Sequence, residues 1–437
     1  MQEINIQDLL NGQLVNYASY DNLRKIGSAI DGLKNAARKV IFTVHEKKIK
    51  EKTKVLQLSN KCAEYADYLH GSLDGVVVTL GQDFAGTNNI PLLQKFGNFG
   101  TRCIQESSAP RYIFAKGSDE LFNLFKYEDD EILDQQYFEG SRIEPKFYVP
   151  SLPMLLVNGS EGVSSGFAQK ILPRNPENLK QYILEKLSGK EPSEELLRPW
   201  IKGFNGGFWH SNEEPNKWWI SGKVEHLKQY DYLITEIPFS YDLKTYTNIL
   251  DDLVEKKEIL RYSNESDGEN SLKFRITVPK GIDTSFNSMI DRLKINKPIS
   301  ENYTSIDENL KVREFASAKE IIDYYIDVKL RYLEKRKASI IEKLKSESKI
   351  LENKCRFLEL CINKKIVIAG KKKTEIESDL KSNKFDEDSF SYLLGMPIYS
   401  LTTEKFEELK AKLAEVNKNI ETVGKTSIQT MWKKDLK

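Results

Sequence analysis

A heptad pattern near the C-terminus constrains the fold more than any other feature. Apolar side chains recur there at alternating steps of three and four residues: Phe406, Leu409, Leu413, Val416, Ile420 and Val423. This spacing places them on one face of a helix and is typical of a coiled-coil seam. Thr402 or Thr403 with Glu404 can cap the start of this helix, and Gly424 can end it.

A second long helix is predicted from about residue 317, because leucines at positions 330, 344, 351 and 358 share one seven-residue register, with Lys337 on the same track. The segment between the two helices, residues 386–401, is compact and contains Leu393, Leu394, Met396, Pro397 and Ile398. Two long helices joined by a small tip predict an antiparallel hairpin. Exposed apolar residues at the tip predict a contact between two copies of the chain.

The rest of the chain predicts two further domains of mixed character. Prolines punctuate residues 173–316, and alternating runs at 218–224, 232–237 and 273–278 predict half-buried strands. Residues 1–172 predict helices over 55–68 and 73–84, joined by a glycine turn as in a helix-turn-helix. The fold class is therefore multidomain α+β. Its predicted domains are 1–172, 173–316 and 317–437.

Composition narrows the setting in which the chain works. Of its 437 residues, 39% are hydrophobic and 30% are charged, and no apolar run approaches the roughly 18 residues of a membrane span. The N-terminus has no basic segment leading into an apolar one, so we expect no secretory signal. Four cysteines form no CxxC pair and suggest reduced thiols. We expect a cytoplasmic protein with no membrane partner.

The charge is balanced overall but uneven locally. The formal net charge is +1, yet residues 24–54 hold ten Lys or Arg against three acids, an excess of +7. Such a local cationic face can neutralise several phosphates of a nucleic acid. A solvated basic helix explains the same charges equally well.

One short segment suits attack on a phosphodiester. Arg111 directly precedes Tyr112 within Ala109-Pro110-Arg111-Tyr112-Ile113-Phe114. A tyrosine hydroxyl has a pKa of about 10 in water and is a weak nucleophile at neutral pH. A neighbouring guanidinium can stabilise the phenolate and can hold a phosphate oxygen. We expect Tyr112 in a short apolar strand. The dipeptide alone does not exclude ordinary packing.

Four motifs share their order and approximate spacing with a known family. They are Asp31-Gly32-Leu33-Lys34 followed by Arg38-Lys39-Val40; Tyr68-Leu69-His70-Gly71; the stretch from Gly97-Asn98-Phe99-Gly100-Thr101-Arg102 to Phe114; and the loop Asn158 to Gly166. Together they resemble the breakage-reunion subunit of type IIA DNA topoisomerases, over residues from about 10 to the end. The resemblance is strongest to the breakage region of eukaryotic topoisomerase II and to the medium subunit of T-even-phage-like enzymes.

This resemblance implies a fold and a set of catalytic residues. The fold would comprise a winged-helix DNA-binding domain, an α+β tower domain and a coiled-coil hairpin with a helical dimerisation tip. Tyr112 would attack a DNA phosphate and Arg111 would hold it. The other catalytic residues would be Arg24, Lys34 and His70. Leu69 departs from the family, which has a second histidine at that position, so a role that needs both imidazoles is in doubt.

The resemblance also implies a DNA-binding set consisting of Val163, Arg38, Lys39 and Arg102. Val163 occupies the place of an aliphatic residue that the family wedges between base pairs to bend DNA. Ordinary core packing of Val163 is the alternative. Valine is one methylene shorter than the family's usual isoleucine, so the bend is expected to be weaker.

No cofactor site is predicted within the chain. The loop at 158–166 lacks the Gly-Lys-Ser/Thr ending of a nucleotide-binding loop. Asp129-Asp130-Glu131 is a metal-site candidate by composition only, and a solvated helix face is the alternative. The resemblance therefore implies that Mg²⁺ and ATP are bound by a separate large subunit with ATPase and acidic metal-binding domains.

The predicted function is that of the DNA-cleaving and rejoining subunit of an ATP-dependent type II topoisomerase. Such a subunit would act as a homodimer on double-stranded DNA and form a transient 5′-phosphotyrosyl link. The alternative from another class is an architectural DNA-binding dimer without catalysis, and it is supported by Leu69 and by the missing metal motif.

Overall fold

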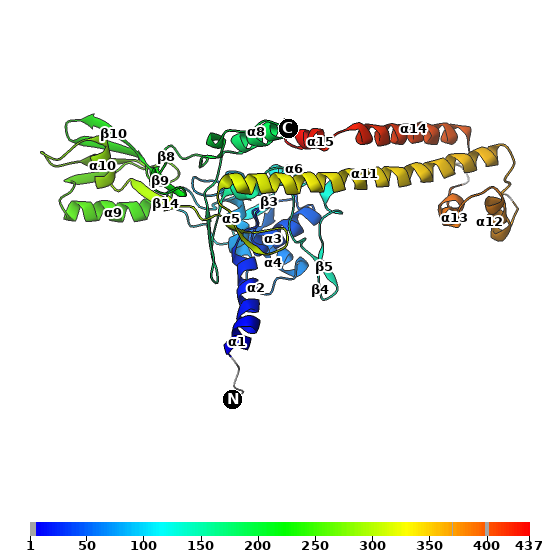
Figure 1. The fold of residues 1–437 in the computed structure, drawn as a ribbon, viewed down its shortest axis with the longest axis horizontal. Coiled ribbons are helices and arrows are strands. Elements are labelled where there is room, and N and C mark those ends of the chain that lie inside the picture. Colours follow the sequence, from blue (N-terminus) through cyan, green and yellow to red (C-terminus); the bar gives the residue numbers. More distant parts are fainter. Residues whose placement is uncertain (1–5, 369, 398–401) are drawn as a thin grey trace. The chain divides into compact units, whose positions relative to one another are not determined.

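A computed structural model of the chain describes residues 6–368, 370–397 and 402–437 and divides it into two compact units (Figure 1). The first unit extends to Lys329 and includes the last three residues, and the second comprises Leu330–Lys434. The fold is mixed, with helices and several small antiparallel sheets. The finer division into three domains stays a prediction.

The N-terminal part of the first unit packs helices against a small sheet. Its helical elements are α1 (Ile6–Asp8), the π-helix η1 (Leu9–Leu14), α2 (Val15–Lys25), α3 (Asn35–Glu46), α4 (Val55–Tyr65) and α5 (Asp74–Gly81). Its strands are β1 (Thr53–Lys54), β2 (Leu93–Phe96) and β3 (Phe114–Gly117), in the order β1-β3-β2. Helix α4 forms as predicted, since Val55, Leu58 and Cys62 are buried at helical spacing.

Short elements connect this region to the rest of the unit. They are α6 (Asp119–Leu124), the 3-10 helix η2 (Tyr127–Asp129), the hairpin of β4 (Gln136–Phe138) with β5 (Ser141–Ile143), α7 (Met154–Asn158), the hairpin of β6 (Ser160–Val163) with β7 (Ala168–Ile171), α8 (Pro176–Lys186) and the 3-10 helix η3 (Glu194–Leu197). Three of these helices are capped at their start by a side chain, those of Ser118, Asn175 and Ser193.

The predicted alternating runs form strands, as expected. A three-stranded sheet has the order β14-β9-β8, and a four-stranded sheet has the order β10-β11-β13-β12. The strands are β8 (Gly207–His210), β9 (Lys217–Ser221), β10 (Lys223–Lys228), β11 (Asp231–Glu236), β12 (Arg261–Asn264), β13 (Phe274–Thr277) and β14 (Asn296–Ser300). Helices α9 (Leu243–Glu255) and α10 (Phe286–Arg292) share one buried core with the four-stranded sheet (Figure 1). The pair β15 (Thr304–Ile306) and β16 (Val312–Glu314) follows.

The C-terminal helices pair in antiparallel fashion. They are α11 (Ala318–Ile362), α12 (Lys373–Ser382), α13 (Glu387–Leu394), α14 (Thr403–Lys425) and α15 (Ile428–Asp435). Contacts between α11 and α14 run in opposite chain directions: the Lys337 ammonium donates to the carbonyl oxygens of Gly424 and Thr426, both at 2.8 Å, and the Ser348 hydroxyl donates to Asn417 Oδ1. Lys337 stands on the apolar track because it satisfies the C-terminal carbonyls of α14.

The tip between these helices has its own small core. Phe357, Leu380, Phe385 and Leu393 are buried there together, with Leu394 and Met396 packed against them. The expectation that Leu393 is exposed for a contact between copies is therefore wrong, because its side chain is 1% exposed in this core. Ile398 lies outside the described residues. Helix α12 was not predicted.

No helix among the described residues has the length and apolar character that crossing a bilayer requires.

Candidate functional site

Tyr112 lies in a tight turn that leads into β3. Its backbone N–H donates to the Ala109 carbonyl oxygen at 2.9 Å, and the strand starts two residues later at Phe114. The predicted placement of Tyr112 within a strand is therefore wrong: the backbone turns on itself at Pro110 before it pairs with β2. The turn leaves the tyrosine side chain 66% exposed, whereas the neighbouring Ile113 is 2% exposed.

The tyrosine turn is fastened to the start of α4. The backbone N–H of Val55 donates to the Ile113 carbonyl oxygen at 2.9 Å, and that of Leu56 donates to the Pro110 carbonyl oxygen at 3.3 Å. The first N–H groups of a helix have no acceptor inside the helix, so the turn supplies one to each of these two. Gly97 is needed alongside, because it adopts φ of +94° and a Cβ there would lie 3.0 Å from the Ile113 side chain.

Arg111 and Tyr112 form an exposed pair. The Arg111 Cζ lies 4.7 Å from the centroid of the Tyr112 ring, a cation–π geometry. The guanidinium thus lies over the ring face and not at the hydroxyl. Among the residues that the structure describes, neither side chain makes a hydrogen bond or an ion pair. Both can therefore bind a ligand from outside without breaking an internal contact.

A separate cleft of about 790 Å³ gathers two of the predicted catalytic cations. Arg24 and Lys34 line it, together with the outer face of α5, formed by Gly75, Val76 and Thr79. Its other wall includes Asn158, Glu161 and Lys170, at the base of the β6–β7 hairpin. The predicted recognition helix of the helix-turn-helix therefore exposes its outer face toward two positive charges.

Lys34 is held at the wall of this cleft. Its ammonium donates to the backbone carbonyl oxygen of Glu161 at 2.6 Å. Burial lowers the pKa of Lys34 from its ordinary value, and the nearby Glu161 carboxylate opposes that effect. The contact joins the start of α3 to β6.

His70 lies beside the end of α2 through a residue that the sequence analysis did not single out. The Tyr20 hydroxyl and His70 Nε2 share a hydrogen bond, and the Arg24 guanidinium lies 5.5 Å from the Tyr20 ring centroid. Tyr68 contacts His70 edge-on, with ring centroids 5.9 Å apart. Leu69, at the position of the family's second histidine, is 77% exposed. The aromatic residues of α2 gave no signal in the sequence that could identify Tyr20.

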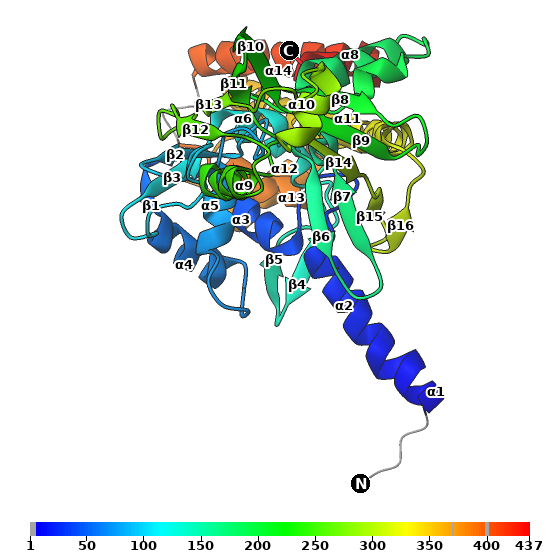
Figure 2. The ribbon, with the colours of Figure 1, turned by 90° about the vertical axis from the view of Figure 1, so that its left-hand side faces the viewer.

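Val163 stands at the end of the β6–β7 hairpin. It pairs with Ala168 across the hairpin, and its side chain is 74% exposed, which excludes the alternative of core packing. Phe167, across the turn, is 37% exposed. Figure 2 shows the hairpin beside α2. Gly162 permits this approach, because a Cβ there would collide with the Lys25 carbonyl oxygen.

Arg38 and Lys39 are buried and already paired. The Arg38 Nε donates to Asp31 Oδ2 at 2.8 Å, and the Lys39 ammonium contacts Glu144 Oε2 at the same distance. The two residues are 6% and 7% exposed. The expectation that Arg38 and Lys39 contact DNA is therefore not supported, because buried carboxylates inside the unit neutralise their charges.

Arg102 is buried in the same way. It is 2% exposed, and its Nη2 donates to the backbone carbonyl oxygens of Ile237 and Pro238 at 3.0 and 3.2 Å. Glu236 lies 3.6 Å from the same nitrogen. The residue ties the loop after β2 to the end of β11, so it too is left out of the proposed interface.

The structure brings some of the predicted residues together and leaves others apart. Arg24, Lys34 and His70 gather around the end of α2 and its cleft. Within the described ranges, no hydrogen bond or ion pair joins Tyr112 to any of them. Asp129 is 4% exposed and lies 3.6 Å from the Lys329 ammonium, so the expected solvated face is wrong there. Across the same ranges, no group of three or more His, Cys, Asp or Glu residues is arranged to hold a metal ion.

A family model that describes the A subunit of DNA gyrase/topoisomerase IV matches residues 24–437. The "DNA topoisomerase 2, mitochondrial" of Dictyostelium discoideum is 30% identical over 454 residues, covering 100% of this chain and 35% of that protein. The "DNA topoisomerase 2" of Invertebrate iridescent virus 6 is also 30% identical, over 99% of this chain and 38% of its own length. The chain thus spans about a third of the length of the curated relatives it matches.

A solved structure supports the same comparison. It is the DNA-binding, cleavage and re-ligation domain of Plasmodium falciparum topoisomerase II, which superposes with a TM-score of 0.88 at 30% identity. The match covers 98% of this chain and 63% of that one.

Proposed function

Because this chain belongs to the family of DNA gyrase/topoisomerase IV A subunits, we propose that it is the DNA-cleaving and rejoining part of an ATP-dependent type II DNA topoisomerase. The observation that carries the proposal is the exposed Arg111–Tyr112 pair, on a turn held by the start of α4 and without internal polar partners among the described residues. The likeness to a cleavage and re-ligation domain supports it.

In the proposed reaction the Tyr112 hydroxyl oxygen attacks a backbone phosphorus and loses its proton. The bond from phosphorus to the 3′ oxygen breaks, and the DNA keeps a 3′ hydroxyl while its 5′ phosphate is joined to Tyr112. The phosphotyrosine retains the bond energy, so the 3′ hydroxyl can reverse the step and reseal the strand. Arg111 would bind the phosphate oxygens as negative charge builds on them, a kind of stabilisation that is worth about 3 kcal/mol for one donor.

The cleft residues would hold the duplex in this scheme. Arg24, Lys34 and His70 would contact phosphates, while the outer face of α5 lies in a groove. We propose that α3, α4 and α5 with β1, β2 and β3 are the winged helix of residues 1–172. Residues 173–316 would be the tower, and residues 317–437 the coiled-coil exit gate through which two copies dimerise.

ATP and Mg²⁺, which the resemblance assigns to the reaction, are proposed to bind to another polypeptide. The described residues do not by themselves fit a magnesium site. A separate large subunit carrying the ATPase and acidic metal-binding domains is the predicted partner. The rest of a relative's length, about two thirds, lies outside the match with this chain.

Trapping the covalent intermediate tests the proposal. The chain is mixed with its partner, Mg²⁺ and an end-labelled duplex, and the reaction is stopped with detergent. The protein would be linked to the 5′ phosphate at the break, so it should be attached to the fragment that keeps the original 3′ end of the strand. A label on that 3′ end should therefore migrate with the protein, and a label on the 5′ end should not. If the active complex relaxes plasmid but gives no protein-linked strand, Tyr112 is not the nucleophile. If it binds and bends DNA without either result, the architectural alternative holds.

The Val163→Ala variant should separate bending from binding. We expect the bent fraction of a bound duplex and the yield of covalent adduct to fall severalfold, because the wedge that opens a base step is shortened. The Kd for duplex should change by less than about twofold, since phosphate contacts supply most of the affinity. End-to-end fluorescence energy transfer on a short duplex measures the bend.

Val367→Ala is the matched control for this substitution, because Val367 is also exposed, at 47%, but lies in the second unit. It should leave bending unchanged. An equal loss of bending, cleavage and affinity in Val163→Ala would argue against a wedge.

A further inference from the structure

The turn of the β6–β7 hairpin is tied to α2 by one carboxylate. Asp21 Oδ2 accepts hydrogen bonds from the Ser164 hydroxyl at 2.9 Å, from the Ser165 hydroxyl at 2.9 Å and from the Ser165 backbone N–H at 3.1 Å. These two serines follow Val163 directly in the chain. Three donors from one turn therefore converge on a single oxygen of a residue 143 positions away.

This carboxylate is enclosed and charged. Asp21 is 7% exposed, and its Oδ1 lies 2.9 Å from the Lys25 ammonium one helical turn along α2. The hydrogen bond with Lys25 contributes most to lowering the pKa of Asp21 to about 2, and the bonds from Ser164 and Ser165 add to it. The aspartate is thus ionised at neutral pH, and hydrogen bonds to an ionised acceptor are about twice as strong as neutral ones.

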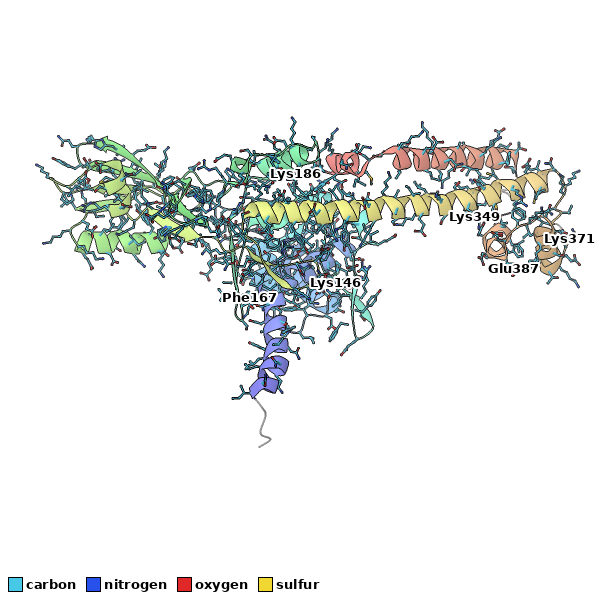
Figure 3. The ribbon with its side chains drawn as sticks, viewed as in Figure 1. Lys146, Phe167, Lys186, Lys349, Lys371 and Glu387 are labelled. Carbon is cyan, nitrogen blue, oxygen red and sulfur yellow. The ribbon has the colours of Figure 1, made fainter. Side chains whose placement is uncertain are left out.

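The turn has few other means of holding its shape. Within it, the Ser164 N–H donates to the Phe167 carbonyl oxygen at 2.9 Å. Gly166 adopts φ of +80°, and a Cβ placed on it would have no atom within 4 Å. The two side chains at either side of the turn, Val163 and Phe167, are exposed and make no core (Figure 3 labels Phe167). Rigid presentation of Val163 therefore depends on a contact from outside the hairpin.

We propose that Asp21 is a positioning residue that holds the β6–β7 turn so that Val163 stands ready to enter a base step, and this inference rests on the proposed function. The same end of α2 bears Tyr20 and Arg24. The Asp21 contact therefore fixes the wedge relative to the cations that would grip the phosphates. If Asp21 holds the turn in place, less conformational entropy is lost when Val163 enters DNA, because the turn already has its bound conformation.

The test compares DNA bending by the full chain and by an Asp21→Asn variant. Asparagine has the same shape but no charge. Its carbonyl oxygen is its only acceptor for the serine donors, because its amide nitrogen can only donate. We expect the bent fraction of bound duplex to fall about tenfold, the effect of losing one hydrogen bond to a charged group. The Kd for duplex should stay within about threefold, because Asp21 carries no phosphate contact.

Two further variants decide whether Asp21 acts through the wedge. In the Val163→Ala background, Asp21→Asn should reduce bending no further, since residues that act through one element are not additive. An additive loss would overturn the proposal. Ser164→Ala with Ser165→Ala removes two of the donors and leaves the helix untouched, so it should also reduce bending. It serves as the test if Asp21→Asn does not fold.

The matched control is Asp83→Asn, which removes the same charge from an exposed pair with Lys95 at the surface of the first unit. It should bend DNA as the wild type does. If Asp21→Asn and the double serine variant both bend DNA as the wild type does, the proposal is wrong while the proposed function stands. If the wild-type chain binds duplex without bending it, the wedge itself is wrong, and this inference falls with it.

Discussion

Tyr112→Phe is expected to abolish covalent attachment of the chain to DNA, a loss of at least about a thousandfold, while duplex binding remains. The substitution removes one oxygen from a side chain that is 66% exposed and has no polar partner among the described residues, so no internal contact is lost. The Arg111 guanidinium can still lie over the phenyl ring and bind a phosphate. Detergent-trapped adducts and a filter-binding Kd, measured on the same preparation, check both halves of the result.

Tyr137→Phe provides the control for that variant. Tyr137 lies on β4 of the same unit and is 68% exposed, so the same atom is removed from an equally accessible site. Adduct formation should be unchanged in this control. Wild-type adduct yield in Tyr112→Phe would show that another residue carries the nucleophile.

Glu301→Gln is expected to reduce the free energy of unfolding of the first unit by about 3–5 kcal/mol, the cost of leaving a buried charge without its partner. The Glu301 carboxylate contacts Arg174 Nη1 at 2.6 Å and Nη2 at 2.7 Å, and both residues are 1% exposed or less as side chains. It also accepts from Trp218 Nε1 at 3.0 Å and from the Tyr303 hydroxyl at 2.7 Å. Glutamine keeps the shape but removes the charge that balances Arg174.

Urea unfolding followed by tryptophan fluorescence measures this effect, because Trp218 reports on the site directly. Glu195→Gln is the control, since its exposed ion pair with Arg198 is worth at most about 1 kcal/mol. A change in Glu301→Gln as small as in the control would mean that the buried pair contributes little to stability. The experiment also bears on function, because Glu301 accepts from the backbone N–H of Leu172, just after the β6–β7 hairpin.

Periodic features of the chain could be predicted well from the sequence. The apolar side chains at positions 406, 409, 413, 416, 420 and 423 form the less exposed face of α14, and the alternating runs became strands of two sheets. Such patterns are local, because side chains point to the same side every three to four residues in a helix and every second residue in a strand. The residues that form one face can therefore be identified from their spacing in the sequence. The antiparallel partner of α14 was also predicted, because only one other long helix carried a matching register.

The site was less accessible to this reasoning. Arg38, Lys39 and Arg102 looked like DNA contacts, since a cation in a family motif has the same appearance whether it faces solvent or a buried carboxylate. Their partners Asp31, Glu144 and the carbonyl oxygens of residues 237 and 238 are brought to them only by the fold. Tyr20 and Asp21 were missed for the converse reason, because their partners His70, Ser164 and Ser165 are 50 or more positions away.

The sequence by itself determined the strongly periodic helices and strands and the presence of an arginine–tyrosine pair, since each depends on neighbouring residues and their spacing. Only the tertiary structure decided which charges are neutralised in the interior and which remain available to a ligand. It also decided that Tyr112 stands in a turn and that a single carboxylate on α2 ties down the Val163 hairpin. The physical reason is that burial and hydrogen bonding depend on contacts between segments that are far apart in the sequence. The local spacing of residues does not specify those contacts.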